Sequence, residues 1–158
     1  MIAKPLDAAY QIFWNRYVAG LPAGERPKDA FVTAEFAGTA ESPDPLIDLY
    51  LEGKKTAGSS MVRDFLTMGD PLPKVGNYWI VLDSRREPRL ILRTIHTEIH
   101  KFKDVPESIA RAEGEGDLSV QAWRAIHRRA YSADLAAWGI PDLEEAEVIT
   151  EHFKLLVP

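Results

Sequence analysis

The sequence contains no cysteine among its 158 residues. A disulfide framework, a thiolate nucleophile and a cysteine-ligated metal are therefore excluded. Long apolar runs are also missing, and residues 1–20 lack the uninterrupted apolar stretch of a signal peptide. An apolar content of 46% and a charged content of 27% are typical of a globular protein. We therefore expect a cytoplasmic protein without a membrane partner.

Standard catalytic signatures are absent as well. The chain has no phosphate-binding loop, no dinucleotide fingerprint and no nucleophile elbow. The histidines are scattered over positions 96, 100, 127 and 152. His96 and His100 can share one face of an extended run, but no third ligand lies near them in the sequence. We therefore predict structural histidines, no metal site and no cofactor, and leave any requirement for a divalent metal open.

Charge is unevenly distributed along the chain. Residues 53–103 carry 10 basic and 5 acidic side chains, a net charge of +5, although the whole chain carries −5. The flanking segments 1–52 and 104–158 carry −4 and −6. This pattern argues against indiscriminate nucleic-acid binding and permits a local anion-binding surface in the middle of the chain. The alternative is a solvated face of a sheet.

The periodicity of apolar residues predicts a mixed α+β fold. Helical spacing appears from residue 7 to 19, and a second helix is expected to begin with Ser42 as N-cap and to end at Gly53. Two extended runs separated by turn residues 83–88 form a plausible hairpin. We predict a mostly antiparallel sheet from the following elements: strands over 31–36, 78–82, 89–102 and 146–157, and further helices over 61–66, 106–112 and from 119 onward.

In the second extended run, strict alternation assigns side chains to two faces. One face holds Leu90, Leu92, Thr94 and His96, and the other holds Ile91, Arg93, Ile95 and Thr97.

Two short stretches stand out from this pattern. Residues 53–60 place Lys54 and Lys55 directly before a cluster of small and hydroxyl residues, which suits either a helix end or a cationic corner for a polar ligand. Residues 113–117 place three carboxylates around two glycines. This segment suits either an acid–base or cation-binding role or an exposed turn that caps the next helix.

Taken together, several segments resemble the ASCH family in order and spacing. They are Gly-Lys-Lys-Thr-Ala at 53–57, Pro-Leu-Pro-Lys-Val-Gly at 71–76, Ala-Glu-Gly-Glu-Gly-Asp at 112–117 followed by Trp123, and Glu151-x-Phe153. The resemblance covers nearly the whole chain from about residue 10. It implies a PUA-like small β-barrel, mostly antiparallel, with surrounding helices. We expect one ASCH domain over residues 1–158 with a helical N-terminal extension at about 7–20.

The resemblance also implies a choice between activities. Small members of the family include amidohydrolases that deacetylate N4-acetylcytidine with a lysine, a threonine and a glutamate. These positions correspond to Lys55, Gly58 and Glu115, so the threonine is replaced here by a glycine, which supplies no hydroxyl. Thr56, Ser59 or Ser60 are candidates to replace it.

Other members of the family bind or cleave single-stranded RNA, and our first hypothesis is RNA hydrolysis in a lysine-lined cleft. Lys55 would stabilise phosphate charge and Glu115 would act as the acid or base. Amide hydrolysis of a modified cytidine nucleoside and non-catalytic RNA binding are the alternatives. No protein partner is expected. The residues predicted to contact the substrate are Lys54, Thr56, Ser59, Arg63, Tyr50 and Ser132, with Tyr131 nearby.

Overall fold

A computed structural model describes residues 5–38 and 42–157. Its α-helices are α1 (Ala8–Ala19), α2 (Pro43–Leu51), α3 (Val62–Met68), α4 (Glu107–Glu113) and α5 (Val120–Tyr131). Its strands are β1 (Val32–Phe36), β2 (Ala57–Met61), β3 (Tyr78–Leu82), β4 (Pro88–Lys101) and β5 (Glu147–Val157). Short 3-10 helices occur at Ala23–Glu25, Phe102–Asp104 and Leu143–Glu145.

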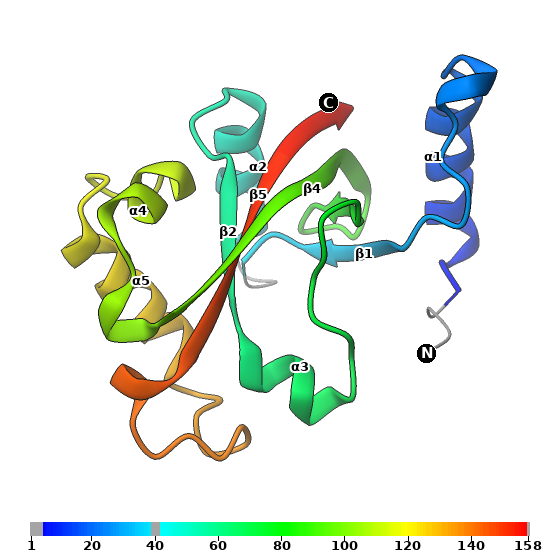
Figure 1. The fold of residues 1–158 in the computed structure, drawn as a ribbon. Helices are drawn as coiled ribbons and strands as arrows, with labels where there is room; N and C mark the ends of the chain where they lie inside the picture. The colour runs from blue at the N-terminus through cyan, green and yellow to red at the C-terminus, as the bar shows by residue number, and fades with distance from the viewer. Residues whose placement is uncertain (1–4, 39–41, 158) are drawn as a thin grey trace.

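The strands form one curled sheet in the order β1-β3-β4-β5-β2. β1 runs parallel to β3, and the other neighbouring strands are antiparallel. The long strands β4 and β5 lie at the centre, and the sheet bends around them into a half-barrel (Figure 1). This mixed α+β architecture, with its mostly antiparallel sheet, confirms the predicted PUA-like fold class.

Helices cover the sheet from different sides. Figure 1 shows α1 at one end of the molecule and the pair α4 and α5 at the opposite end. Three clusters of buried side chains correspond to this arrangement. Trp14 of α1 packs with Tyr78, Ile47 of α2 belongs to the cluster that contains Phe153, and Trp123 of α5 belongs to the third. Among the described residues, no helix is both long and apolar enough to cross a membrane.

Most of the predicted elements are present. The helix expected at residues 7–19 is α1, and the helix expected to end at Gly53 is α2, with Gly53 at φ +74°. The small-residue cluster after Lys55 is not a loop, because residues 57–61 form strand β2 against β5. The helix that begins after Ser119 ends at Tyr131 and does not continue to Trp138. Ser42 precedes α2 as predicted, but neither it nor Asp7 before α1 makes a side-chain cap hydrogen bond. Ser119 accepts a hydrogen bond from Ala122 N at the start of α5.

Strict alternation along β4 is wrong beyond Thr94. Thr94 pairs with Phe153, and His96 pairs with the next residue along the partner strand, His152, so Ile95 is an extra residue in a β-bulge. One additional residue reverses the side on which the following side chains lie. Thr94 and His96 are therefore on opposite faces, contrary to the alternation predicted from the sequence.

Candidate functional site

The two unusual sequence stretches meet at the start of β2. Thr56 N donates a hydrogen bond to Ala112 O at 2.7 Å, and this contact joins β2 to the end of α4. Gly114 ends α4 with φ +71°, and a Cβ placed on it would lie 2.2 Å from Lys54 O. Only glycine permits this approach without a backbone shift. The acidic turn is thereby held against Lys54 and Lys55.

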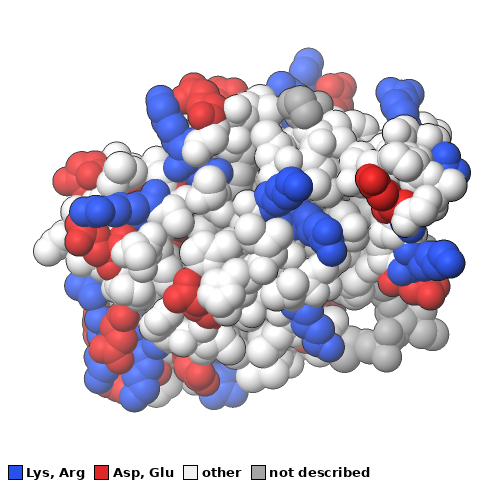
Figure 2. Space-filling view, turned by 45° about the horizontal axis from the view of Figure 1, so that its top comes forward, with Lys and Arg blue, Asp and Glu red and all other residues white. Residues whose placement is uncertain are grey.

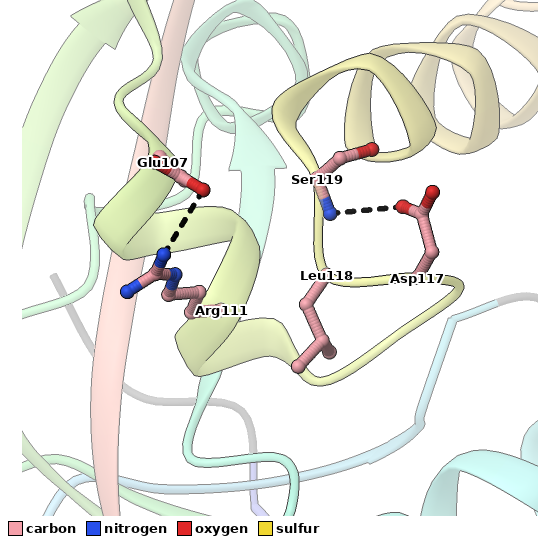
Figure 3. Close-up of a pocket in the computed structure, with 5 residues that line it drawn as sticks. All are labelled: Glu107, Arg111, Asp117, Leu118 and Ser119. Atoms are coloured by element: carbon pink, nitrogen blue, oxygen red, sulfur yellow. Dashed lines mark hydrogen bonds and ion pairs between the residues drawn. The ribbon is translucent and has the colours of Figure 1, made fainter.

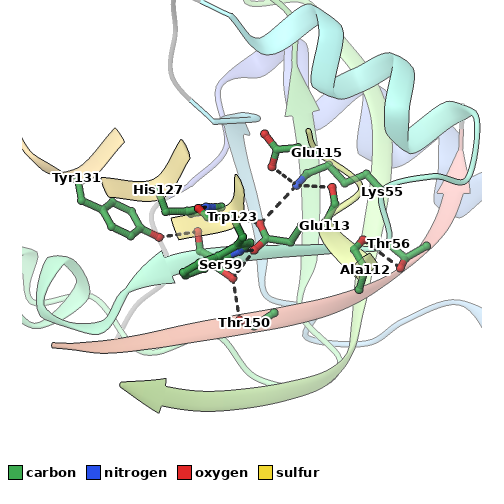
Figure 4. A network of polar contacts seen from close by, with 10 residues as sticks. All are labelled: Lys55, Thr56, Ser59, Ala112, Glu113, Glu115, Trp123, His127, Tyr131 and Thr150. Atoms are coloured by element: carbon green, nitrogen blue, oxygen red, sulfur yellow. Dashed lines mark hydrogen bonds and ion pairs between the residues drawn. The ribbon is translucent and has the colours of Figure 1, made fainter. Parts of the chain in front are cut away.

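Lys55 is a buried lysine, with only 5% of its surface exposed. Its Nζ lies 3.1 Å from Glu115 Oε2 and 3.5 Å from Glu113 Oε1, and it also donates to Glu113 O at 3.3 Å. The ring of Tyr50 lies below the ammonium, 5.5 Å from Nζ to the ring centroid. Lys55 is therefore bound by two carboxylates and is not the exposed cationic corner that the sequence suggested (Figure 4).

Glu113 lies at the centre of this network and is 1% exposed. Its Oε2 accepts from Ser59 Oγ at 2.8 Å and from Trp123 Nε1, while its Oε1 faces Lys55 and His127. Burial alone would raise the pKa of this carboxyl. Hydrogen bonding and charge from His127, together with Lys55 and Trp123, outweigh burial and lower the pKa to about 2.

His127 completes the buried part of the network. Its Nδ1 lies 2.9 Å from Trp123 O, and its Nε2 lies 3.4 Å from Glu113 Oε1. Both ring nitrogens face acceptors, and only the imidazolium form can donate to both. Burial favours the neutral ring, but the hydrogen bond and charge of Glu113 outweigh it and raise the pKa of His127.

Ser59 connects the network to the sheet. Its hydroxyl donates to Glu113 and lies 2.7 Å from Thr150 Oγ1 on β5. Since the single hydroxyl hydrogen of Ser59 is used on Glu113, Thr150 is the donor in the second contact. Tyr131 OH also donates to the carbonyl of Ser59 at 3.3 Å. These hydrogen bonds fix the position of Ser59 next to the Lys55–Glu115 pair.

Three side chains of this network are of the types that bind metal ions. One ligand atom from each of Glu113, Glu115 and His127 lies within 4.8 Å of the others. The ammonium of Lys55 already contacts both carboxylates, however, and Oε2 of Glu113 is taken by two donors. An ion would have to displace Lys55, so the lysine itself serves as the cation of this site.

Gly58 lies beside a hydroxyl group. A Cβ on Gly58 would meet Tyr50 OH at 3.3 Å and the ring of Phe153 at 3.4 Å. Burial, followed by the charge of nearby carboxylates, raises the pKa of Tyr50 well above its usual value, so the phenol stays protonated. The Tyr50 hydroxyl therefore lies next to the position where a larger residue 58 would begin its side chain.

Glu151 is a third carboxylate close to Tyr50. It pairs with Gly58 across the β2–β5 ladder, and Thr94 Oγ1 donates to its Oε2 at 2.6 Å. Burial raises its pKa, and the hydrogen bond from Thr94 offsets only part of that effect. Glu151 was noticed in the sequence only as part of a motif.

The remaining predicted contact residues lie in different surroundings. Lys54 is exposed and paired with Glu52 at 2.7 Å. The Thr56 hydroxyl bonds to Ala112 O, and Arg63 is exposed on α3. The Ser132 hydroxyl donates back to Arg129 O at the end of α5. The side chains of Lys55, Glu115, Ser59 and Tyr50 thus lie together in the Lys55 network. The other predicted contact residues lie at the edge of this network.

Glu113, His127 and Thr150 were missed as site residues by sequence reasoning. Glu113 belongs to the acidic run that the sequence singled out, but burial distinguishes it from Glu115, whose side chain is 19% exposed. His127 follows the apolar stripe of α5, which predicts packing and not an ion pair.

The hollow beside the acidic turn is a separate feature. Figure 3 shows it between α4 and the start of α5. Its polar groups are already paired, since Arg111 bonds to Glu107 at 3.1 Å and Ser119 N bonds to Asp117 Oδ1 at 2.9 Å. It is lined by Glu107, Arg111, Asp117, Leu118 and Ser119.

Comparison with known proteins finds a matching family model and similar solved structures. The family model for the ASCH domain matches residues 30–157. An ASCH domain from Lactobacillus crispatus is 24% identical with a TM-score of 0.88, and each chain is covered in full. A protein from Enterococcus faecalis is 27% identical with a TM-score of 0.74, covering 92% of this chain and 86% of that one. No curated protein matches the sequence significantly.

Proposed function

The chain belongs to the ASCH domain family, and from this we propose that it hydrolyses the amide of an N4-acylated cytosine, with Lys55 and Glu115 at the reacting bond. Family and fold support an RNA-binding domain of the PUA-like type. The protein would accordingly bind the acylated base as a free nucleoside or within single-stranded RNA.

The observation that carries this proposal is the close pair formed by Lys55 Nζ and Glu115 Oε2, 3.1 Å apart. Glu115 is the member of the network that reaches the surface, because its side chain is 19% exposed whereas those of Lys55 and Glu113 are 4% and 2% exposed. Glu115 can take a proton from an attacking water and deliver it to the leaving amine as the C–N bond breaks, while the Lys55 ammonium stabilises the oxyanion. Partial burial strengthens both interactions.

Tyr50 supplies the hydroxyl group that Gly58 lacks. Its phenol is protonated and lies beside Gly58, so it can donate a hydrogen bond to the acyl oxygen of a substrate bound there. A threonine at position 58 would crowd Tyr50 OH, since its Cβ would already be 3.3 Å away. Glycine at 58 and tyrosine at 50 therefore fit each other as a pair.

The same geometry favours amide hydrolysis over RNA cleavage. A phosphate at Lys55 would also face the carboxylates of Glu113 and Glu115, within 3.5 Å of the ammonium. An anionic substrate is repelled by this arrangement, whereas a neutral acyl group is not.

A basic and aromatic hollow offers a contact surface for RNA. It lies between α1 and the sheet and is lined by Tyr17, Tyr78, Arg93 and Lys154 together with one carboxylate and two apolar side chains, Glu25, Leu21 and Leu156. Arg93 lies over the ring of Tyr78, 5.7 Å from the guanidinium carbon to the ring centroid. Cationic and aromatic side chains together suit single-stranded RNA, since the former contact phosphates and the latter stack on bases.

The experiment measures acetate release from N4-acetylcytidine by the wild type, Glu115→Gln and Tyr50→Phe. Glu107→Gln, which alters an exposed glutamate of α4, is the matched control. We expect Glu115→Gln to lose at least about 100-fold in turnover, which is the low end for an acid–base group. Thermal melts establish that each variant is folded.

Labelled single-stranded RNA is tested beside the nucleoside in the same assay. Nucleoside turnover that survives Glu115→Gln, or no nucleoside turnover by the wild type, would contradict the proposal. RNA cleavage lost in Glu115→Gln would instead favour the nuclease hypothesis.

A further inference from the structure

A second group of titratable side chains lies on β4 and β5, outside the Lys55 network. His96, Glu98 and His100 are alternate residues of β4 beyond the bulge, so they share one face of the strand. His152 lies opposite His96 on β5. The sequence offered two histidines without a third ligand, and the strand pairing supplies one.

The bulge at Ile95 determines this grouping. Without an extra residue there, His96 would lie on the same face as Thr94 and away from His152. Bulges frequently re-aim a side chain, and here the bulge places three imidazoles around one carboxylate.

Glu98 is the centre of the group. Its Oε2 lies 2.6 Å from His152 Nε2 and 4.0 Å from His96 Nε2, and its Oε1 lies 3.9 Å from His100 Nε2. The rings of His96 and His152 are 5.4 Å apart between centroids. Among the described residues, the ion-pair partners of Glu98 are all histidines, in contrast to Glu115, which is bound by a lysine.

Two of the imidazoles have unused binding capacity. The contacts of His96 and His100 with Glu98 are near 4 Å, longer than a hydrogen bond. The His100 nitrogen that faces Glu98 is Nε2, whereas its Nδ1 is enclosed and has no hydrogen-bond partner in the described part of the chain. The His96 side chain is 63% exposed, so its ring can turn toward a common point without disturbing the core.

We propose that His96, Glu98 and His152 form a binding site for a divalent transition metal beside His100, with Zn²⁺ as the best fit. Imidazole nitrogens with one carboxylate oxygen are borderline donors that suit Zn²⁺ and not Mg²⁺ or Ca²⁺. The ion takes the place of the hydrogen bond between Glu98 and His152, and the neighbouring rings rotate onto it. Bound there, it would join β4 to β5.

The test titrates tag-free protein with Co²⁺, a visible stand-in for Zn²⁺, and then displaces it with Zn²⁺. The variants are His96→Ala and His152→Ala, and Glu147→Gln, an exposed carboxylate on β5, is the control. We expect one equivalent of Co²⁺ with a tetrahedral spectrum in the wild type and the control. Each histidine variant should weaken binding by at least about tenfold, because even changes around metal ligands cost that much.

Three results would overturn the proposal. The first is the absence of saturable binding in the wild type. The second is unchanged affinity in both histidine variants. The third is binding that is lost in Glu113→Gln but kept in His96→Ala, which would move the ion to the Lys55 network. Circular dichroism of each variant separates loss of binding from loss of folding.

Discussion

At the scale of single residues, the burial of Lys55 beside Glu113 is the feature with the largest energetic consequence. A buried ion pair is costly to desolvate, and removing one partner leaves the other as an uncompensated charge. The sequence suggested a cationic corner at Lys54 and Lys55, and the loss of an exposed lysine costs little stability. Lys55 and Glu113 are both almost fully enclosed, so Lys55 is not exposed and its loss is expected to affect stability as well as activity.

We expect Lys55→Met to destabilise the fold by about 3 to 5 kcal/mol, the usual cost of breaking a buried ion pair. Lys54→Met is the matched control, because Lys54 is exposed and its loss should leave the free energy of unfolding nearly unchanged. Denaturant unfolding of both variants measures the difference. The double variant Lys55→Met with Glu113→Gln should cost less than the sum of the single changes, and strict additivity would contradict the pairing.

Glu113 and His127 make stability depend on pH from two sides. The pKa of Glu113 falls from 4.5 to about 2 on folding, so its contribution is complete above pH 4.5 and is lost as the pH falls toward 2. The pKa of His127 rises above 6.5, so its contribution is complete below pH 6.5 and is lost as the pH rises through the raised value.

Melting temperature should therefore be highest between these limits. In Glu113→Gln both slopes should flatten, since His127 loses the partner that raises its pKa. Thermal melts from pH 3 to 9 provide the measurement, with Glu107→Gln as the control. A Glu113→Gln profile parallel to that of the wild type would argue against this assignment.

At the scale of elements, the site depends on how α4 ends against β2. Gly114 and Gly69 both end a helix with left-handed φ values, +71° and +72°. Nothing lies within 4 Å of a Cβ on Gly69, whereas a Cβ on Gly114 would meet Lys54 O at 2.2 Å. The two positions share the conformational penalty and differ only in the clash.

We expect Gly69→Ala to cost about 1 to 2 kcal/mol, the price of a left-handed alanine. Gly114→Ala should cost clearly more, because α4 must move away from β2, and it should also lower activity by shifting Glu115. Denaturant unfolding of both variants compares the two costs. Equal losses in the free energy of unfolding would mean that the backbone around Lys54 shifts to accept the added Cβ at little energetic cost.

At the scale of the whole molecule, the distribution of surface charge bears on how RNA could bind. Figure 2 shows a face on which Lys and Arg side chains are spread among Asp and Glu, without a continuous basic area on that face. Within the basic middle of the sequence, Lys55 lies in the interior, and other residues form surface ion pairs, such as that of Lys101 with Glu145. RNA binding should therefore involve few phosphates.

We expect a shallow salt dependence of RNA affinity, which Arg93→Ala with Lys154→Ala should make shallower still. Each phosphate contact on a single strand contributes about 0.7 to the slope of log affinity against log salt, so the double variant should lose about 1.4. Arg85→Ala with Lys101→Ala, which removes two basic residues with acidic partners, is the control. An unchanged slope in the first double variant would exclude the hollow beside α1.

Elements with a strong apolar periodicity, or with a glycine or turn residues at their ends, were predictable from the sequence. The helix ending at Gly53, the hairpin of β3 and β4 and the final strand β5 follow from local propensity and glycine geometry. Strand β2 was missed because residues 57–61 are mostly small and weak in β-propensity, and their pairing with β5 outweighs that preference.

Lys55 and Glu115 were selected because the resemblance to the ASCH family implies that they act together, and the structure places their side chains 3.1 Å apart. The central position of Glu113 and the turn of His96 toward His152 were decided only in three dimensions. Periodicity says which face a side chain is on, but partners more than 50 residues apart meet through strand register, a bulge and a helix end. Those features arise from packing of the whole chain, which is why burial and pairing, and with them the charge of each group, required the tertiary structure.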